Sequence, residues 1–145
     1  MSDGASLLIQ ASAVAISGRA LLLEGPPGSG KSSLALALID RGARLIGDDG
    51  VILTRQGERL IATPPPNTTG LIEIRNVGLI ELPVAPPAPL ALILSLAADA
   101  ERLPDSAQER VFLGLGVPAL AFTPGAIAPA VRAEWALHRH GLAPD

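Results

Sequence analysis

The stretch GPPGSGKS, residues 25–32, decides the fold, because it matches the phosphate-binding pattern G-x-x-x-x-G-K-[ST]. The apolar run ALLLEG, residues 20–25, leads into it in the manner of a buried strand. KSSLALALIDR, residues 31–41, follows with the composition of a helix, and Gly42 would end that helix. A strand before the pattern and a helix after it favour a working phosphate loop over a chance glycine-rich turn.

The residue types of this loop suit the phosphates of a nucleotide. Glycine lets backbone N–H groups turn toward phosphate oxygens, and the positive end of the following helix attracts the same anions. Lys31, the only lysine among 11 basic residues, would reach the β- and γ-phosphates, and the Ser32 hydroxyl would ligate Mg²⁺. The predicted nucleotide-binding residues are Gly25, Pro26, Pro27, Gly28, Ser29, Gly30, Lys31, Ser32 and Ser33.

The composition narrows the class of protein. With 145 residues, of which 48% are hydrophobic and 17% charged, the chain can bury one core, and we expect a single domain over residues 1–145. A net charge of −3 argues against nucleic-acid binding. The chain has no cysteine, and its longest apolar stretch, LALILSLAA, is about half as long as a membrane span. We therefore expect a soluble, cytoplasmic protein with no membrane contact.

The rest of the pattern predicts more strands than helices. Strands and hairpins are expected over residues 43–49, 51–63, 71–82, 90–97 and 111–122. Loops are expected at residues 63–70, 83–89 and 101–109. A closing helix over residues 126–140 would place Trp135 in the core. The expected fold class is therefore α/β, a P-loop domain with a mixed, strand-rich sheet and few helices.

Two adjacent acids, Asp48 and Asp49, end the strand that follows the P-loop helix. Phosphoryl transfer needs an acid that positions the metal and a group that activates the acceptor. If this strand lies beside the P-loop strand, one carboxylate can hold Mg²⁺ while the other takes a hydroxyl proton. D-D-G is equally good turn chemistry. Composition leaves both interpretations open, and closeness to the P-loop favours chemistry.

GPPGSGKSSLALALIDRGARLIGDDGVIL, followed by GLIEIRNVGLIEL, resembles the catalytic domain of bacterial HPr kinase/phosphorylase, from about Gln10 to Leu82. That family phosphorylates and dephosphorylates a serine of the phosphocarrier protein HPr. The resemblance implies a short form that consists of the C-terminal P-loop domain, with a fold like the phosphoenolpyruvate carboxykinase core. It also implies use of ATP and Mg²⁺, HPr as partner, a role in regulating the phosphotransferase system, and the family's hexamer as a candidate assembly.

The resemblance also assigns roles to residues. Asp48 would be the general base in phosphorylation and the general acid in the reverse reaction, with Lys31 and Arg75 as further catalytic residues. Ser32, Asp49 and Glu73 would contact the metal. Without the resemblance, LIEIR, residues 71–75, would be interpreted as an amphipathic strand whose charges face solvent.

The sequence departs from the family at several positions. Gln10 stands where the family has a histidine in a strand before the P-loop, and glutamine takes up no proton near neutral pH. Ser33 stands where an acid is common, and Asn76 replaces a glycine, which a turn with positive φ would tolerate. Arg102, Arg110 and Arg132 are candidates for a basic residue that long forms carry in this part of the chain.

These departures keep two alternatives open. One is an ATP-binding sensor with little transfer activity, and the other is a related kinase with a different acceptor.

Overall fold

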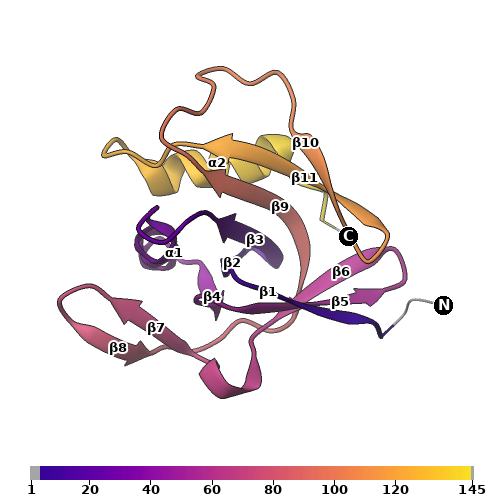
Figure 1. The fold of residues 1–145 in the computed structure, drawn as a ribbon, viewed down its shortest axis with the longest axis horizontal. Coiled ribbons are helices and arrows are strands. Elements are labelled where there is room, and N and C mark those ends of the chain that lie inside the picture. The colour runs from indigo at the N-terminus through magenta and orange to yellow at the C-terminus, as the bar shows by residue number, and fades with distance from the viewer. Residues whose placement is uncertain (1–3, 145) are drawn as a thin grey trace.

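The computed structural model describes residues 4–144, which form eleven strands, two α-helices and a short 3-10 helix at Pro66–Thr68 (Figure 1). The helices are α1 (Lys31–Asp40) and α2 (Pro129–His140). The strands are β1 (Ser6–Ile9), β2 (Ser12–Ile16), β3 (Arg19–Glu24), β4 (Arg44–Gly47), β5 (Val51–Gln56), β6 (Arg59–Thr63), β7 (Leu71–Ile74), β8 (Gly78–Glu81), β9 (Ala88–Leu96), β10 (Gln108–Phe112) and β11 (Leu115–Phe122). The expected class, a mixed, strand-rich sheet with few helices, is confirmed.

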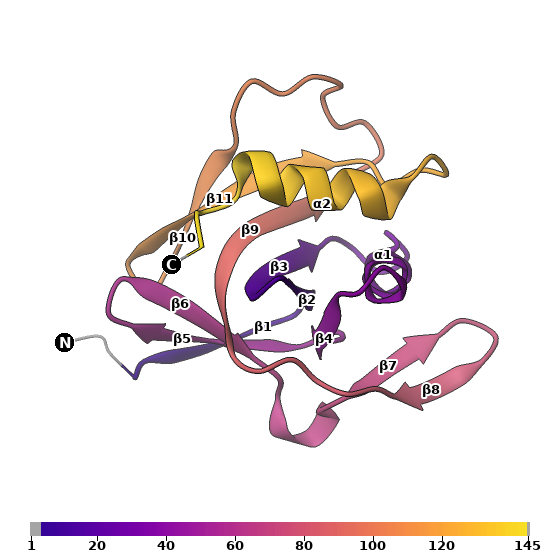
Figure 2. The same ribbon diagram turned by 180° about the vertical axis from the view of Figure 1, so that it is seen from behind.

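The long strand β9 organises the main sheet. It pairs in parallel with β3 on one side and with β11 on the other, and β10 closes that edge antiparallel to β11. Beyond β3 the order continues through β2 to β4, with antiparallel pairing at both steps. The first residues of β9, Ala88 and Pro89, pair instead with β6, which continues to β5 and β1. Figure 2 shows β9 curving from β6 toward β3.

The continuous apolar run of β3 is buried because both faces of the sheet are covered. Leu21 and Leu23 face the helices and pack in one core cluster with Leu38 of α1. Leu22 points to the opposite face, where it packs with Leu53 of the β1–β5–β6 layer. All four of these leucines on β3 and α1 have no exposed surface. The run therefore carries no polar alternation, as predicted for a strand buried on both sides.

The helix predicted after the P-loop, and its termination at Gly42, are confirmed by α1. It begins at Lys31 and ends at Asp40, and Gly42 follows with φ 107°. The Gly42 N–H donates to the carbonyl oxygen of Ile39 at 3.0 Å. Only glycine adopts this left-handed conformation without a steric penalty, so the sequence signal and the geometry agree.

Helix α2 begins later than predicted, at Pro129, where proline suits the first helical position. The prediction that Trp135 anchors this helix in the core is wrong, because 65% of its surface is exposed. The residues that α2 buries are small or aliphatic: Ala130, Ala133, Ala136 and Leu137. Small side chains let the helix axis approach the sheet closely, which leaves the indole on the outer face.

The segment predicted as strand over residues 71–82 forms a separate hairpin, β7–β8, which projects beside α1 (Figures 1 and 2). Its turn places Asn76 at φ 67°, which confirms the positive φ that asparagine was expected to tolerate. The hairpin base is closed by the Leu82 N–H, which donates to the Gly70 carbonyl at 2.7 Å.

Neither helix in residues 4–144 has both the length and the apolar surface needed to cross a bilayer.

Candidate active site

The P-loop joins the end of β3 to the start of α1 as an open turn. Gly28 has φ 82° and Gly30 has φ 98°, and a Cβ atom added to either would meet no atom within 4 Å. Gly30 is the N-cap of α1 and has no side chain with which to bond the N–H groups of the first helical turn. The loop therefore presents glycine backbone and helix N–H groups to open space, which fits a bound phosphate.

The Lys31 ammonium lies over this loop. Its Nζ donates to the Gly25 carbonyl at 2.7 Å and to the Pro26 carbonyl at 3.4 Å. Ser32, the next residue, turns the other way and donates its hydroxyl to a carboxylate oxygen of Asp48 at 2.6 Å. The loop thus supplies both a cation and a hydroxyl, as the phosphate pattern predicts.

Asp48 accepts hydrogen bonds from three separate parts of the chain. Its Oδ1 atom accepts from the Ser32 hydroxyl at 2.6 Å and from the Ser12 hydroxyl at 2.9 Å. Its Oδ2 atom accepts from the backbone N–H of Glu73 at 3.1 Å. The half-buried carboxylate is therefore fixed between the P-loop, the start of β2 and the β7–β8 hairpin.

The strand order explains why these three parts of the chain meet at Asp48. It differs from the simplest arrangement, in which β4 would lie directly beside the P-loop strand β3. β4, which directly precedes Asp48, is separated from β3 by β2. Because β2 is antiparallel to both neighbours, its first residue lies at the edge where β3 and β4 end, and Ser12 pairs with Leu23 of β3. Ser12 thus bridges the gap between the two strands and contacts Asp48.

The turn after β4 depends on glycine. A Cβ atom at Gly47 would overlap the carbonyl oxygen of Gly50, so a larger residue there would displace the turn. Between them, Asp49 has φ 62° and an exposed side chain. This tight turn directs Asp48 inward toward the P-loop and leaves Asp49 outward.

A cavity of about 220 Å³ lies beside the P-loop on the hairpin side. Glu73 and Arg75, both exposed, line it together with Lys31, Ser32, Ser33 and the loop glycines Gly28 and Gly30. Of the three predicted metal contacts, the structure brings Ser32 and Glu73 to this cavity and leaves Asp49 outside its lining. One carboxylate and one hydroxyl, completed by phosphate oxygens, fit the way proteins bind Mg²⁺ with a nucleotide.

No three acidic or histidine side chains within residues 4–144 gather as a metal cluster.

Sequence reasoning missed Ser12 and Glu24. The Glu24 carboxylate, which ends β3, accepts two hydrogen bonds from Arg110 of β10, at 2.8 and 2.6 Å. The Arg110 hydrogen bond lowers the pKa of Glu24, and the same bond raises the pKa of Arg110. The partners are 86 residues apart, so only the sheet order brings them together. The sequence feature that could have identified Glu24 is a charged residue at the end of a buried strand.

Gln10 and the C-terminal arginines occupy positions that sequence reasoning left open or placed wrongly. Gln10 lies exposed in a bend between β1 and β2, outside the strand expected for it. Arg110 binds Glu24, and Arg132 donates to backbone carbonyls after β11, including that of Thr123 at 2.8 Å. Arg102 is exposed. None of these side chains lines the 220 Å³ cavity.

Comparisons with known proteins show which family this chain resembles in sequence. The family model of the HPr Serine kinase C-terminal domain matches residues 5–87. HPr kinase/phosphorylase of Clostridium botulinum (strain Eklund 17B / Type B) is 44% identical over 69 residues, which are 48% of this chain and 23% of that protein. The enzyme of the same name from Chlorobium phaeobacteroides (strain BS1) is 37% identical over 75 residues, 51% of this chain and 22% of that protein. The matched segment thus spans less than a quarter of either relative.

The likeness of structure extends over most of the chain. The Hpr(Ser) kinase/phosphatase from Coxiella burnetii superimposes with a TM-score of 0.80 at 28% sequence identity, covering 91% of this chain and 94% of that chain. The structural similarity therefore extends beyond residue 87, where the family match ends.

Proposed function

Because the chain belongs to the HPr Serine kinase C-terminal domain family, we propose that it is a protein-serine kinase that uses ATP and Mg²⁺. Its acceptor in this proposal is HPr or an HPr-like phosphocarrier, and it acts in the cytoplasm in regulation of the phosphotransferase system. The names of the relatives and of the similar solved structure support HPr as the acceptor. The observation that carries the proposal is the 2.6 Å hydrogen bond between Ser32 and Asp48, because it joins the phosphate loop to the candidate base.

The P-loop residues would hold the donor. Backbone N–H groups of residues 25–32 and the first turn of α1 would bind the phosphates, and Lys31 would neutralise the β- and γ-phosphates. Ser32 and Glu73 would hold Mg²⁺, which when bound neutralises charge on the phosphate oxygens. Asp49 is a third candidate contact, although its side chain lies outside the cavity lining.

Asp48 would act on the acceptor. As the acceptor serine oxygen attacks the γ-phosphorus, Asp48 takes the hydroxyl proton, and the bond to ADP breaks with its electron pair leaving on ADP. Arg75, on the cavity wall, would stabilise the charge on the transferring group. In the reverse direction an oxygen of inorganic phosphate attacks the phosphoserine, pyrophosphate forms, and Asp48 returns the proton to the serine oxygen.

Transfer of labelled phosphate from Mg·ATP to HPr of the same organism tests this proposal. We expect label on the HPr serine, no label on HPr with alanine at that serine, and a loss of about 10²- to 10⁴-fold in Asp48→Asn, which lacks the base. Asp105→Asn, a charge-matched change at an exposed position of the loop after β9, should keep full activity. Adding inorganic phosphate to labelled HPr should release pyrophosphate.

The alternatives give different results in the same assay. If Mg·ATP binds but neither HPr nor another acceptor is labelled, the chain is an ATP-binding sensor. If another acceptor is labelled and HPr is not, the chain is a kinase of another substrate. Either result overturns the acceptor assignment.

A further inference from the structure

Ser12 is completely buried and lies beside the candidate active site. Across residues 4–144 it is the one polar or charged residue that is buried, and none of its surface is exposed. Its hydroxyl donates to Oδ1 of Asp48 at 2.9 Å. Buried polar groups are normally paired, and here the partner is the proposed base. The core of the described chain therefore places its single polar side chain against the carboxylate on which the proposed transfer depends.

We propose that Ser12 is a positioning residue for this transfer. Its hydroxyl holds the Asp48 carboxylate in the rotation in which Oδ1 faces Ser32 and Oδ2 faces the acceptor. The inference rests on the proposed function, because it takes Asp48 as the base. It adds a residue that sequence reasoning missed, and it assigns the proton to one of the two carboxylate oxygens.

The two oxygens of Asp48 differ in the donors that reach them. Oδ1 accepts from two hydroxyls, those of Ser12 and Ser32, at 2.9 and 2.6 Å. In the described part of the chain, Oδ2 accepts only from the Glu73 N–H, at 3.1 Å. A carboxylate oxygen has about two lone-pair sites, so Oδ1 is saturated and Oδ2 has a site left. Oδ2 is therefore the oxygen that takes the serine proton, as the serine oxygen bonds to the γ-phosphorus and the bond to ADP breaks.

Of the three donors, Ser12 is the one that depends on neither a ligand nor the hairpin. The Ser32 hydroxyl is also a proposed Mg²⁺ contact, and the Glu73 N–H belongs to the β7–β8 hairpin, which forms a sheet of its own. Ser12 begins β2, which is paired on both sides, with β3 and with β4. Because Ser12 is fully buried, water does not readily replace its hydroxyl. Ser12 is thus the donor that the rigid part of the fold supplies to Asp48.

An irregularity in the pairing of β2 with β4 lies directly before Asp48. Two consecutive residues of β2 pair with Gly47 and Leu45, so Ile46 between them is passed over and the register shifts. An extra residue on one strand bends that strand and redirects the side chains near it, and such bulges are frequent next to active sites. The break in regular pairing therefore falls where it turns the Asp48 carboxylate toward Ser12.

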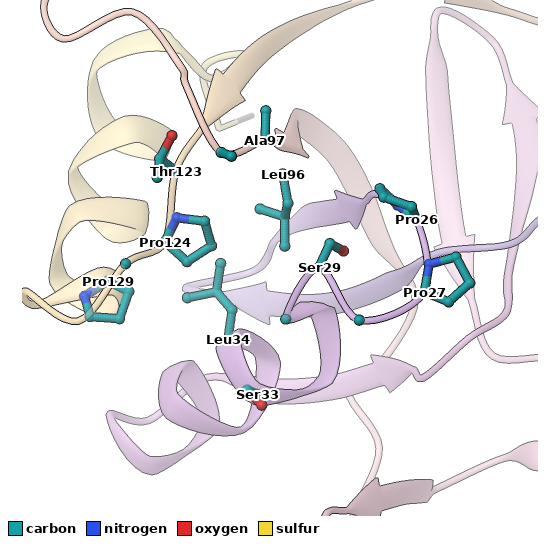
Figure 3. A pocket seen from close by; sticks show the side chains of 14 residues that line it. Pro26, Pro27, Ser29, Ser33, Leu34, Leu96, Ala97, Thr123, Pro124 and Pro129 are labelled. Carbon is teal, nitrogen blue, oxygen red and sulfur yellow. The ribbon is translucent and has the colours of Figure 1, made fainter.

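The other hydroxyls of the phosphate loop do not take the place of Ser12. Ser29 and Ser33 both line a cavity of about 610 Å³, and Figure 3 shows their positions around it. The Ser29 Oγ atom is buried with no hydrogen-bond partner in the described residues, so it does not bond to Asp48. Within the same residues, the donors to Asp48 do not include Ser33. Removal of the Ser12 hydroxyl should therefore leave Oδ1 with a single donor and the carboxylate free to rotate.

Steady-state phosphate transfer from Mg·ATP to HPr by the full chain tests the inference, at a temperature where every variant is folded. We expect Ser12→Ala to lower kcat about 10- to 100-fold, because a rotating carboxylate presents Oδ2 to the acceptor only part of the time. The KM for ATP, and the Kd of Mg·ATP from calorimetric titration, should change by less than about twofold, since Ser12 lines neither cavity beside the P-loop.

Two comparisons separate positioning from a loss of stability. Val14→Ala, at a fully buried position of the same strand on the face that packs against the helices, removes core packing without touching Asp48. Its kcat should stay within about twofold of the parent value. In the Asp48→Asn background, Ser12→Ala should change the residual kcat by less than about threefold, because the two residues act as one unit.

Each outcome decides a different point. If Ser12→Ala and Val14→Ala have the same kcat, or if Ser12→Ala lowers kcat as strongly in the Asp48→Asn background as in the parent, Ser12 does not position the base and the inference is wrong. A raised KM for ATP at unchanged kcat would also overturn it, because Ser12 would then serve donor binding. If the parent itself transfers phosphate to no acceptor, the proposed function fails and the inference fails with it.

Discussion

The hydrogen bond from Ser12 to Asp48 can be tested by the substitution Ser12→Ala. Ser12 has no exposed surface, so water does not readily replace its hydroxyl. The substitution removes one of the three hydrogen bonds that Asp48 accepts. A hydrogen bond to a charged group contributes about 1.5–3 kcal/mol. We expect the free energy of unfolding to fall by about that amount, which for a chain of this size lowers Tm by roughly 5–10 °C.

The assay is urea unfolding at pH 7, with Ser6→Ala as the control. The Ser6 hydroxyl also has a partner, Thr54 at 2.9 Å, but it is exposed, and its loss should cost less than about 0.5 kcal/mol. In the background of Asp48→Ala the effect of Ser12→Ala should shrink by at least about 1 kcal/mol, because the bond is already gone. Equal losses for Ser12→Ala and Ser6→Ala, or an undiminished loss in the Asp48→Ala background, would refute the reasoning.

Three further predictions concern the turn, the ion pair and the core. Gly47→Ala should cost about 1–3 kcal/mol in urea unfolding and reduce the proposed phosphate transfer, because the added Cβ overlaps the Gly50 carbonyl and displaces the turn that holds Asp48, the proposed base. Glu24→Gln should lower the free energy of unfolding by about 1 kcal/mol near pH 7, because it removes the charge that pairs with Arg110. Since the pKa of Glu24 in the folded protein lies below 4.5, this difference should vanish as the pH falls through that pKa, which unfolding curves at several pH values would show. Leu92→Ala, fully buried, should cost about 2–5 kcal/mol by the same measurement, while Leu79→Ala, 68% exposed, should cost less than about 0.5 kcal/mol.

The parts of the fold that depend on neighbouring residues were predictable. The P-loop, the start of α1 and the stop at Gly42 all follow from residue types within a few positions of one another. The turn at Asn76 was likewise expected from a local conformational preference. The roles of these residues toward a nucleotide remain predictions, because they concern a bound state.

The parts that depend on strand order were not predictable. Ser12 reaches Asp48 only because β2 lies between β3 and β4, and no spacing in the sequence encodes that insertion. Arg110 reaches Glu24 only because β10 and β11 extend the sheet beyond β9. Trp135 was misplaced for a related reason: its size suggested burial, whereas the distance between helix and sheet selects small residues there.

β9 pairs with strands in both parts of the sheet, and this limits how the protein can unfold locally. Its first residues pair with β6 and the rest pair with β3 and β11, so its loss would break both groups of strands at once. Local unfolding is therefore expected only in elements outside this pairing, such as the separate β7–β8 hairpin. Amides of residues 90–94 should exchange with solvent deuterium only through global unfolding. Among the described residues, the β7–β8 hairpin pairs with no strand of the main sheet, but its Ile72 is fully buried and its Glu73 N–H donates to Asp48, so opening of the hairpin would remove one of the hydrogen bonds that position this carboxylate.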